Sequence, residues 1–207
     1  GLVELPLALM NPGDLLLLPD PGYPDYLSGV SLGRVTYETF HLTAENDFLP
    51  DLDAIPEETA RRAKFIYINY PNNPTGAVAT KAFYEKLVAW AKTYEVGVVS
   101  DLAYGALGYQ GYENPSFLST PGAKDVGIEF YTFSKTFNMA GWRLAFAAGN
   151  EQMIEALNLI QDHLFVGIFP ALQEAGIAAL LDPKSEEAVA QLNATYDSRR
   201  DAFVQTA

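Results

Sequence analysis

The sequence predicts an α/β fold in three layers, with helices on both faces of a mostly parallel sheet. Short apolar runs alternate with segments of helical spacing, and strands separated by helices pair in parallel and are covered on both faces. The chain has 207 residues, of which 49% are hydrophobic, enough for one sizeable core. The expected strands are Leu15–Pro19, Lys64–Tyr70, Val96–Asp101, Ile128–Ser134 and Leu144–Gly149.

The last of these strands departs from the parallel pattern. Only the segment Lys135–Arg143 separates it from the strand before it. A parallel crossover needs a dozen or more residues. We therefore predict that Leu144–Gly149 pairs antiparallel to its predecessor.

Helices are expected between the strands and after the last one. Thr80–Glu95 has helical apolar spacing, with Thr80 as its N-cap and Gly97 as the residue that ends it. Asn150 can cap a second helix, and a third begins near Pro170. The last helix is expected to open at Asp182–Pro183, to run to Ala207 and to carry on one side Val189, Leu192, Tyr196 and Phe203.

Composition excludes several functional classes. The formal net charge of −13 argues against nucleic acid and anionic membranes as partners. No apolar run approaches the roughly 18 residues that span a bilayer. The absence of cysteine excludes a disulfide framework and a thiolate metal site, and fits a cytoplasmic protein. His41 and His163 have no carboxylate or second histidine at ligand spacing, so no metal is expected.

Three polar residues stand at the carboxyl ends of predicted parallel strands. Asn73 follows the second strand, Asp101 closes the third, and Lys135 follows the fourth. Ligands of open α/β sheets bind outside the carboxyl ends of the strands. The sequence therefore predicts that three separate loops meet in one crevice.

Lys135 differs from the other lysines, which lie at strand starts, on helix faces or in loops. It follows a buried strand and stands among hydroxyl side chains. Burial and nearby cationic groups would disfavour the charged form of its amine and free it to attack a carbonyl. Lys135 is therefore the candidate for a nucleophilic lysine, and the alternative is that a Ser-Lys pair has no catalytic meaning by itself.

An anion site is predicted beside this lysine. Arg143 has a planar fork suited to bidentate binding of a phosphate. Thr132 and Ser134 alternate with Phe133 along a strand, so both hydroxyls can face that site. The alternative is that Arg143 is a surface arginine after a Gly-Trp turn.

Asp101 has two interpretations as well. It can cap a following helix, or it can sit in a low-dielectric crevice, where a carboxylate needs a positive partner. Tyr104 falls on the same side if the chain turns helically. Asn73 lies in a stretch, 71–76, that is also a good turn sequence without any ligand.

Four motifs together resemble class I/II aminotransferases, the fold-type I enzymes that use pyridoxal 5′-phosphate (PLP). They are Tyr70–Gly76 (YPNNPTG), Asp101–Tyr104 (DLAY), Thr132–Arg143 (TFSKTFNMAGWR) and Asp20–Tyr26 (DPGYPDY). The similarity covers essentially the whole chain, and the ordered motifs are highly specific. Asn46–Glu57 most resembles the branch that contains LL-diaminopimelate and alanine aminotransferases.

This resemblance implies a role for each matching residue around the cofactor ring. Lys135 would form the Schiff base and move the proton during catalysis. Asp101 would pair with the pyridine nitrogen, Asn73 and Tyr104 would bond the ring oxygen O3′, and Tyr23 would stack on the ring.

The resemblance also implies that Thr132, Ser134 and Arg143 bind the phosphate of PLP. Thr132 stands where serine is commoner in the family, which keeps the hydroxyl. The segment His163–Phe169 departs from the polar pattern typical of diaminopimelate enzymes, which weakens a substrate assignment.

The domain organisation follows from the same resemblance. Residues 1–181 are expected to form a PLP-transferase large domain, incomplete at its N-terminus, and residues 182–207 to start a helix leading to a small domain outside this chain. The family implies amino-acid and 2-oxo-acid substrates and a homodimer with shared active sites. We expect this stretch alone to bind PLP weakly and to turn over little or nothing.

Two other functions fit the same motifs. A PLP-dependent C–S β-lyase would use the same lysine, aspartate and phosphate groups. A non-catalytic ligand-binding domain, such as the aminotransferase-like half of some transcription regulators, is a further alternative. A DNA-binding module elsewhere in the gene product would favour that reading.

Overall fold

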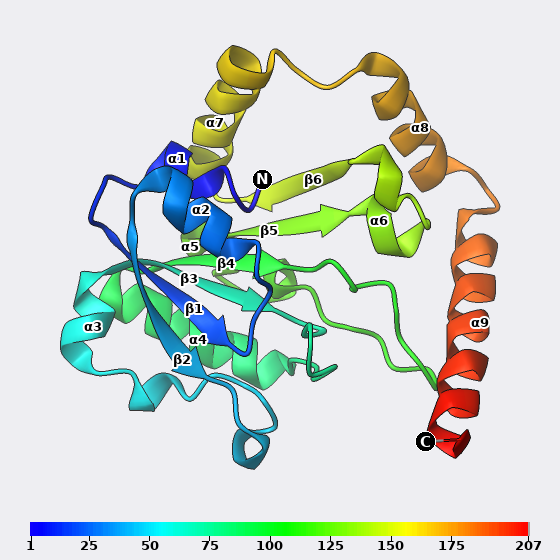
Figure 1. The fold of residues 1–207 in the computed structure, drawn as a ribbon, viewed down its shortest axis with the longest axis horizontal. Helices are drawn as coiled ribbons and strands as arrows, with labels where there is room; N and C mark the ends of the chain where they lie inside the picture. Colours follow the sequence, from blue (N-terminus) through cyan, green and yellow to red (C-terminus); the bar gives the residue numbers. More distant parts are fainter. Residues whose placement is uncertain (207) are drawn as a thin grey trace.

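The computed structural model describes residues 1–206 and contains one six-stranded sheet with helices on both faces (Figure 1). The strand order is β2-β1-β3-β4-β5-β6, and all neighbours are parallel except β5 and β6, which are antiparallel. The three-layer fold and the antiparallel last strand are therefore confirmed. The strands are β1 (Leu15–Asp20), β2 (Thr36–His41), β3 (Ala63–Asn69), β4 (Gly97–Asp101), β5 (Gly127–Thr132) and β6 (Ala145–Gly149).

Helices of very different lengths cover the sheet and extend beyond it. The α-helices are α1 (Leu5–Leu9), α2 (Tyr26–Gly33), α3 (Glu57–Arg62), α4 (Lys81–Tyr94), α5 (Ala123–Val126), α6 (Phe133–Thr136), α7 (Glu151–Ile160), α8 (Pro170–Leu181) and α9 (Ser185–Thr206). Short 3-10 turns are η1 (Ala44–Asn46), η2 (Leu52–Ala54), η3 (Phe117–Ser119) and η4 (Ala140–Trp142), and η5 (Gln161–Phe165) is a π-helical turn.

Two hydrophobic cores hold the layers together, one on each face of the sheet. Alternate residues of β3 point to opposite faces, so Ile66 joins the core under α4 while Tyr67 joins the core under α1, α2 and α7. Leu87 of α4 and Leu5 of α1 are fully buried in these two cores. Burial on both faces explains why β3 is a nearly continuous apolar run.

The helix α4 begins as the sequence predicts and ends at Tyr94, three residues before Gly97. The Thr80 hydroxyl accepts a hydrogen bond from the Phe83 N–H at 3.1 Å, which caps the first turn. Glu95, in the left-handed region with φ of 56°, caps the other end. Gly97 instead starts β4, where an added Cβ would collide with the Phe65 ring. Its small size serves packing between strands, so the prediction that it ends the helix is wrong.

The edge strand β2 was missed by the sequence analysis. Only Phe40 of this strand is buried, so the strand has no continuous apolar run to mark it. Its register pairs His41 with Asp20, and the His41 Nδ1 lies 3.2 Å from the Asp20 carboxylate. Asp20 is thus a carboxylate neighbour of His41 that sequence spacing does not indicate, and both side chains are exposed.

The predicted strand boundaries mostly lie within one residue of those in the structure, but one strand end and the start of the last helix differ by two residues. The strand expected over Ile128–Ser134 ends at Thr132, because the Thr132 hydroxyl accepts the Ser134 N–H and turns the chain into α6. The last helix begins at Ser185 rather than at Pro183, because the Asp182 carboxylate accepts the Lys184 N–H and holds a turn there.

The apolar side predicted for α9 is not buried. None of its described residues is buried, and Phe203 is 73% exposed. The helix stands at the side of the molecule toward which β3, β4 and β5 point (Figure 1). Ala207, to which the helix was expected to run, lies outside the described residues. The cap predicted for α7 and the start predicted for α8 are correct: the Asn150 side chain accepts hydrogen bonds from the Gln152 and Met153 N–H groups, and α8 begins at Pro170.

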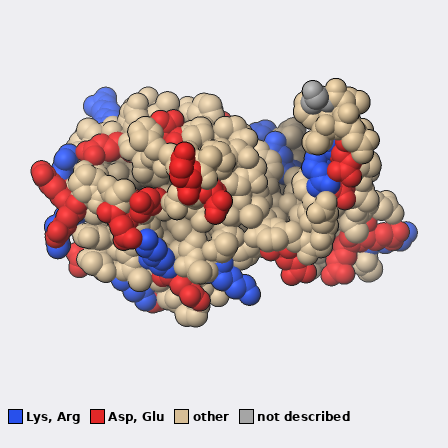
Figure 2. All heavy atoms as spheres, turned by 90° about the horizontal axis from the view of Figure 1, so that it is seen from below, with Lys and Arg blue, Asp and Glu red and all other residues tan. Residues whose placement is uncertain are grey.

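The surface reflects the acidic composition. On the face seen in Figure 2, acidic side chains are spread over the part that contains the sheet and over the part formed by the last helices. Basic side chains lie among them. Within residues 1–206 no helix is both long and apolar enough to cross a membrane. No group of three side chains in the same range is arranged to hold a metal ion.

Candidate active site

A pocket of about 430 Å³ lies at the carboxyl ends of β3, β4 and β5. It is the place where the sequence analysis expected separate loops to meet. The structure brings all of the predicted residues to its lining: Tyr23, Asn73, Asp101, Tyr104, Thr132, Ser134, Lys135 and Arg143. The volume is in the range typical of small-molecule sites.

Asp101 ends β4 and is only 8% exposed. Burial raises the pKa of its carboxyl group to about 6, and hydrogen bonds from the Tyr26 hydroxyl and the Ala103 N–H partly oppose that rise. None of the ion pairs among the described residues includes Asp101. The alternative in which Asp101 caps a following helix is wrong, because residues 103–106 form turns. The pocket thus contains a buried carboxylate without a cationic partner.

Tyr26, which the sequence analysis did not assign to the site, supports this carboxylate. Its hydroxyl donates to Asp101 Oδ2 at 2.9 Å, and the side chain is 2% exposed. Its ring packs edge to face with Tyr67 and with Tyr23, at centroid distances of 5.2 and 5.6 Å. Burial raises the pKa of the Tyr26 hydroxyl well above its ordinary value, so it remains a donor. The motif Asp20–Tyr26 contained this residue, but nothing in it indicated a partner so distant in sequence.

Replacement of Tyr26 by phenylalanine is expected to raise the pKa of Asp101 above its present value of about 6. The variant loses a hydrogen bond to the ionised form, which corresponds to an upward shift of about one unit. Titration of the Asp101 carboxyl carbon by NMR measures the shift. Tyr67→Phe is the matched control, because the Tyr67 hydroxyl donates to the Leu2 carbonyl. An unchanged Asp101 titration in Tyr26→Phe would contradict the assignment.

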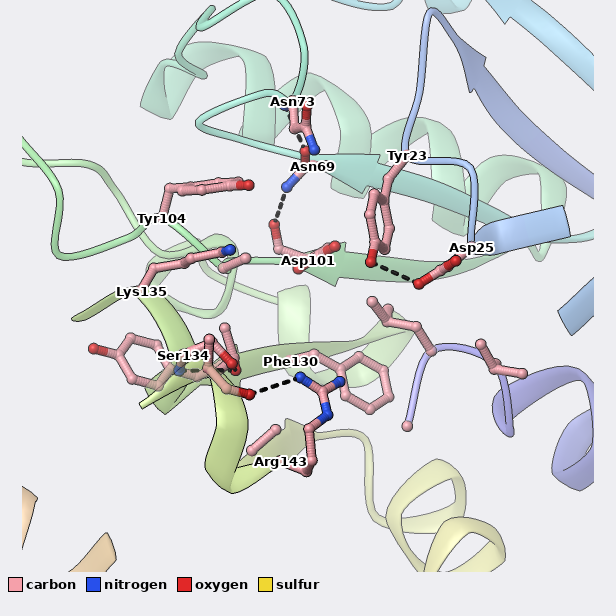
Figure 3. A pocket seen from close by; sticks show the side chains of 18 of the residues that line it. Tyr23, Asp25, Asn69, Asn73, Asp101, Tyr104, Phe130, Ser134, Lys135 and Arg143 are labelled. Carbon is pink, nitrogen blue, oxygen red and sulfur yellow. Dashed lines mark hydrogen bonds between the residues drawn. The ribbon is translucent and has the colours of Figure 1, made fainter. Parts of the chain in front are cut away.

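Tyr23 and Tyr104 stand on two sides of the pocket (Figure 3). The Tyr23 hydroxyl donates to the Asp25 carboxylate at 2.6 Å, which raises its pKa. Tyr104 lies in the turn after β4, where burial raises the pKa of its hydroxyl. Asn73 follows β3, and its backbone N–H donates to the Asn69 side chain at 2.8 Å. Asn69 is a further pocket residue that the sequence analysis missed.

Lys135 lies in the short helix α6, directly after β5. Its amine reaches across the pocket toward Asp101 (Figure 3), and its Nζ lies 5.9 Å from the centroid of the Tyr104 ring. The side chain is exposed, so the expected burial of this lysine is wrong. The four-residue helix projects the side chain into the open pocket instead of enclosing it.

The predicted anion site is assembled by a different local geometry from the expected one. Thr132 and Ser134 do not alternate along one strand, because Ser134 already belongs to α6. Their hydroxyls nevertheless meet, at 2.9 Å, and the Thr132 hydroxyl also contacts the Leu144 carbonyl. Arg143 has a left-handed backbone with φ of 54° and donates from Nη1 to the Ala140 carbonyl at 3.0 Å. Its guanidinium faces Ser134 across the pocket, although the residue is exposed (Figure 3).

Comparison with known proteins decides the family. Residues 1–206 match the family model described as aminotransferase class I and II. The chain belongs to this family. Class I/II aminotransferases and the fold neighbours of this chain are PLP-dependent enzymes, and its near relatives are named aminotransferases or transaminases. The predicted family and fold are therefore confirmed.

Individual aminotransferases match over almost the whole chain. The L-glutamine--4-(methylsulfanyl)-2-oxobutanoate aminotransferase of Bacillus subtilis is 55% identical, over 99% of this chain and 51% of its own length. The LL-diaminopimelate aminotransferase of Desulforudis audaxviator is 50% identical, over 100% of this chain and 52% of its own. The substrate-bound structure of BacF from Bacillus subtilis superposes with a TM-score of 0.94 at 49% identity, covering 98% of this chain and 51% of that one. The chain spans about half the length of these relatives.

Proposed function

We propose that this chain provides the PLP site of an aminotransferase that moves an amino group between an amino acid and a 2-oxo acid. The observation that carries the proposal is that Asp101 and Lys135 line the same pocket, in a chain of this family. A carboxylate held at a pKa of about 6 by burial calls for a cation beside it. A protonated pyridine nitrogen is such a cation, and PLP carries one.

The residues around Asp101 suit the remaining edges of the PLP ring. Tyr23 presents an aromatic face to the pocket, which suits stacking on the ring. Asn73 and Tyr104 carry hydrogen-bond donors on the side of the pocket away from Asp25. We assign these two residues to the ring oxygen O3′. Thr132, Ser134 and Arg143 supply hydroxyl and guanidinium donors, and we assign them to the phosphate.

When bound, PLP supplies a ring that withdraws electrons and so stabilises negative charge at Cα of the amino acid. Lys135 would hold the cofactor through its Nζ, and the same amine would move a proton between Cα of the amino acid and the neighbouring position. The Asp101 carboxylate would hold the proton on the pyridine nitrogen. The Tyr104 hydroxyl, whose pKa is raised by burial, remains a donor throughout.

The test of this function is amine transfer by the full-length gene product. The protein is supplied with PLP, with glutamine or LL-diaminopimelate as donor, and with 4-(methylsulfanyl)-2-oxobutanoate or another 2-oxo acid as acceptor. These compounds follow the names of the relatives. The expected result is a new amino acid formed in equal amount to the 2-oxo acid released from the donor. Release of a thiol, pyruvate and ammonia from cysteine conjugates without amine transfer would overturn the proposal in favour of a lyase.

Replacement of Arg143 by alanine is expected to weaken PLP binding by roughly tenfold to a hundredfold, the effect of removing one charge-assisted hydrogen-bond donor set. Pyridoxal, which lacks the phosphate, is expected to bind both proteins alike. Equilibrium dialysis with the two compounds measures the difference. Arg61→Ala is a matched control, since Arg61 is an exposed arginine paired with Glu57 on α3. Equal losses for PLP and pyridoxal would contradict the phosphate assignment.

We further propose a cytoplasmic homodimer, with residues 1–181 as the large domain and α9 as the start of the interdomain helix. Support for an interface comes from large apolar side chains exposed around η5 and α8, among them Leu164, Val166, Phe169 and Leu181. Light scattering on the full-length gene product tests the dimer. A monomer at micromolar concentration would contradict it.

A further inference from the structure

Asn69 occupies the last position of β3, in register with Asp101 of β4. It is 2% exposed and lines the pocket at the point where the two strands end. Its side chain has no part in the chemistry proposed above. A fully buried amide at such a position needs partners for both its oxygen and its nitrogen.

Both partners belong to residues assigned to the cofactor. The Asn69 Nδ2 donates to the backbone carbonyl of Asp101 at 2.9 Å, and the Asn69 Oδ1 accepts the backbone N–H of Asn73 at 2.8 Å (Figure 3). Because the carbonyl can only accept and the N–H can only donate, the orientation of the amide is determined by its neighbours. One rigid side chain therefore links the backbone of Asp101 to that of Asn73.

The other hydrogen bonds of the turn after β3 close it on itself. The Asn72 N–H donates to the Ala77 carbonyl, and the Gly76 N–H donates to the Asn72 carbonyl. The Asn72 side chain accepts from the backbone and the hydroxyl of Thr75. Unlike these bonds within the turn, the bond from the Asn73 N–H to the Asn69 side chain anchors Asn73 to the end of the strand.

We propose that Asn69 is a positioning residue, which holds Asn73 at a fixed place relative to Asp101 so that Asp101 can meet the ring nitrogen and Asn73 the ring hydroxyl of the cofactor at the same time. This inference rests on the proposed function, because it takes Asp101 to meet the ring nitrogen and Asn73 the ring hydroxyl. Preorganised donors bind more strongly because little ordering remains to be done on binding. Without Asn69, a buried carbonyl and a buried N–H lose their partners and the turn is free to shift.

The test compares PLP with its 3-deoxy analogue, which lacks the ring hydroxyl. Both dissociation constants are measured by equilibrium dialysis with the full-length gene product. The native protein is expected to prefer PLP by about a hundredfold, because Asn73 and Tyr104 are both assigned to the ring oxygen and one good hydrogen bond to a charged or polarised group is worth about tenfold. Asn69→Ala is expected to reduce this preference to about tenfold, because the donor of Tyr104 remains, and the same is expected for Asn69→Leu, which fills the volume of the amide.

Two more variants separate positioning from general destabilisation. Asn69→Asp keeps an acceptor for the Asn73 N–H and is expected to retain the preference. Thr80→Ala removes the cap of α4, away from the pocket, and is expected to lower thermal stability and leave the preference unchanged.

An undiminished preference in Asn69→Ala or Asn69→Leu would overturn the inference, as would a reduced preference in Thr80→Ala. If both apolar variants fail to fold, Asn69→Asp decides: a retained preference supports the inference and a lost one overturns it. Failure of the proposed function is distinguishable: without a PLP site the native protein would bind neither compound, and a PLP enzyme of another kind would bind both but fail the amine-transfer assay.

Discussion

Lys135→Ala, made in the full-length gene product, is expected to abolish covalent attachment of PLP and to lower amine transfer by roughly a thousandfold or more. The variant lacks both the amine that attaches the cofactor and the base that moves the Cα proton. Borohydride treatment followed by peptide mass mapping measures the first loss, and the transfer assay measures the second. The native protein should gain the mass of the reduced cofactor on the peptide containing Lys135.

Lys81→Ala provides the control for this experiment. Lys81 is an exposed lysine at the first position of α4, away from the pocket. It should retain both the labelled peptide and the transfer rate. Label on another lysine of the native protein, or unchanged transfer in Lys135→Ala, would show that the nucleophile has been assigned to the wrong residue.

Asp101→Asn is expected to have opposite effects on stability and on cofactor binding. Burial raises the pKa of Asp101 from 3.8 to about 6, so the folded protein releases this proton less readily than the unfolded chain. The carboxyl group therefore contributes stability that is present below about pH 4 and lost as the pH rises through 6. At pH 8, without cofactor, the variant should unfold with a free energy higher by up to about 3 kcal/mol.

The same variant should bind PLP at least about a hundredfold more weakly, because the ring nitrogen loses its carboxylate. Urea unfolding of the cofactor-free protein at pH 5 and pH 8 measures the stability difference, which should shrink toward pH 5. Glu129, whose pKa is also raised by burial, is unchanged in both proteins and cancels in the comparison. Equal stability of the two proteins at both pH values would show that Asp101 carries no burial cost.

The parts of the site that depend on strand order could be predicted from the sequence. Asn73, Asp101 and Lys135 follow three apolar strands, and the geometry of parallel sheets brings such positions together. The antiparallel β6 followed from the length of one connection. Both arguments use information that is local in the sequence.

The parts that depend on contacts between distant segments could not be predicted. Tyr26 meets Asp101 across 75 positions, and Asn69 meets it across 32. Neither residue type indicates its partner before the chain is folded. The exposure of Lys135 was also missed, because a lysine after a buried strand can point either into the core or into a crevice. The edge strand β2 lacks the apolar run that marks the central strands.

The short antiparallel connection between β5 and β6 has a mechanical consequence. Lys135 and Arg143 both lie on it, and their flanking strands are paired from Thr132–Ala145 to Ile128–Gly149. The distance between the Lys135 amine and the Arg143 guanidinium is therefore set by the short chain segment between them, which the two paired strands hold at both ends. Insertions after β3 or β4 would leave that spacing intact. A single residue added between Thr136 and Ala140 would change the distance between Lys135 and Arg143. The two side chains would then no longer fit the two ends of one bound cofactor.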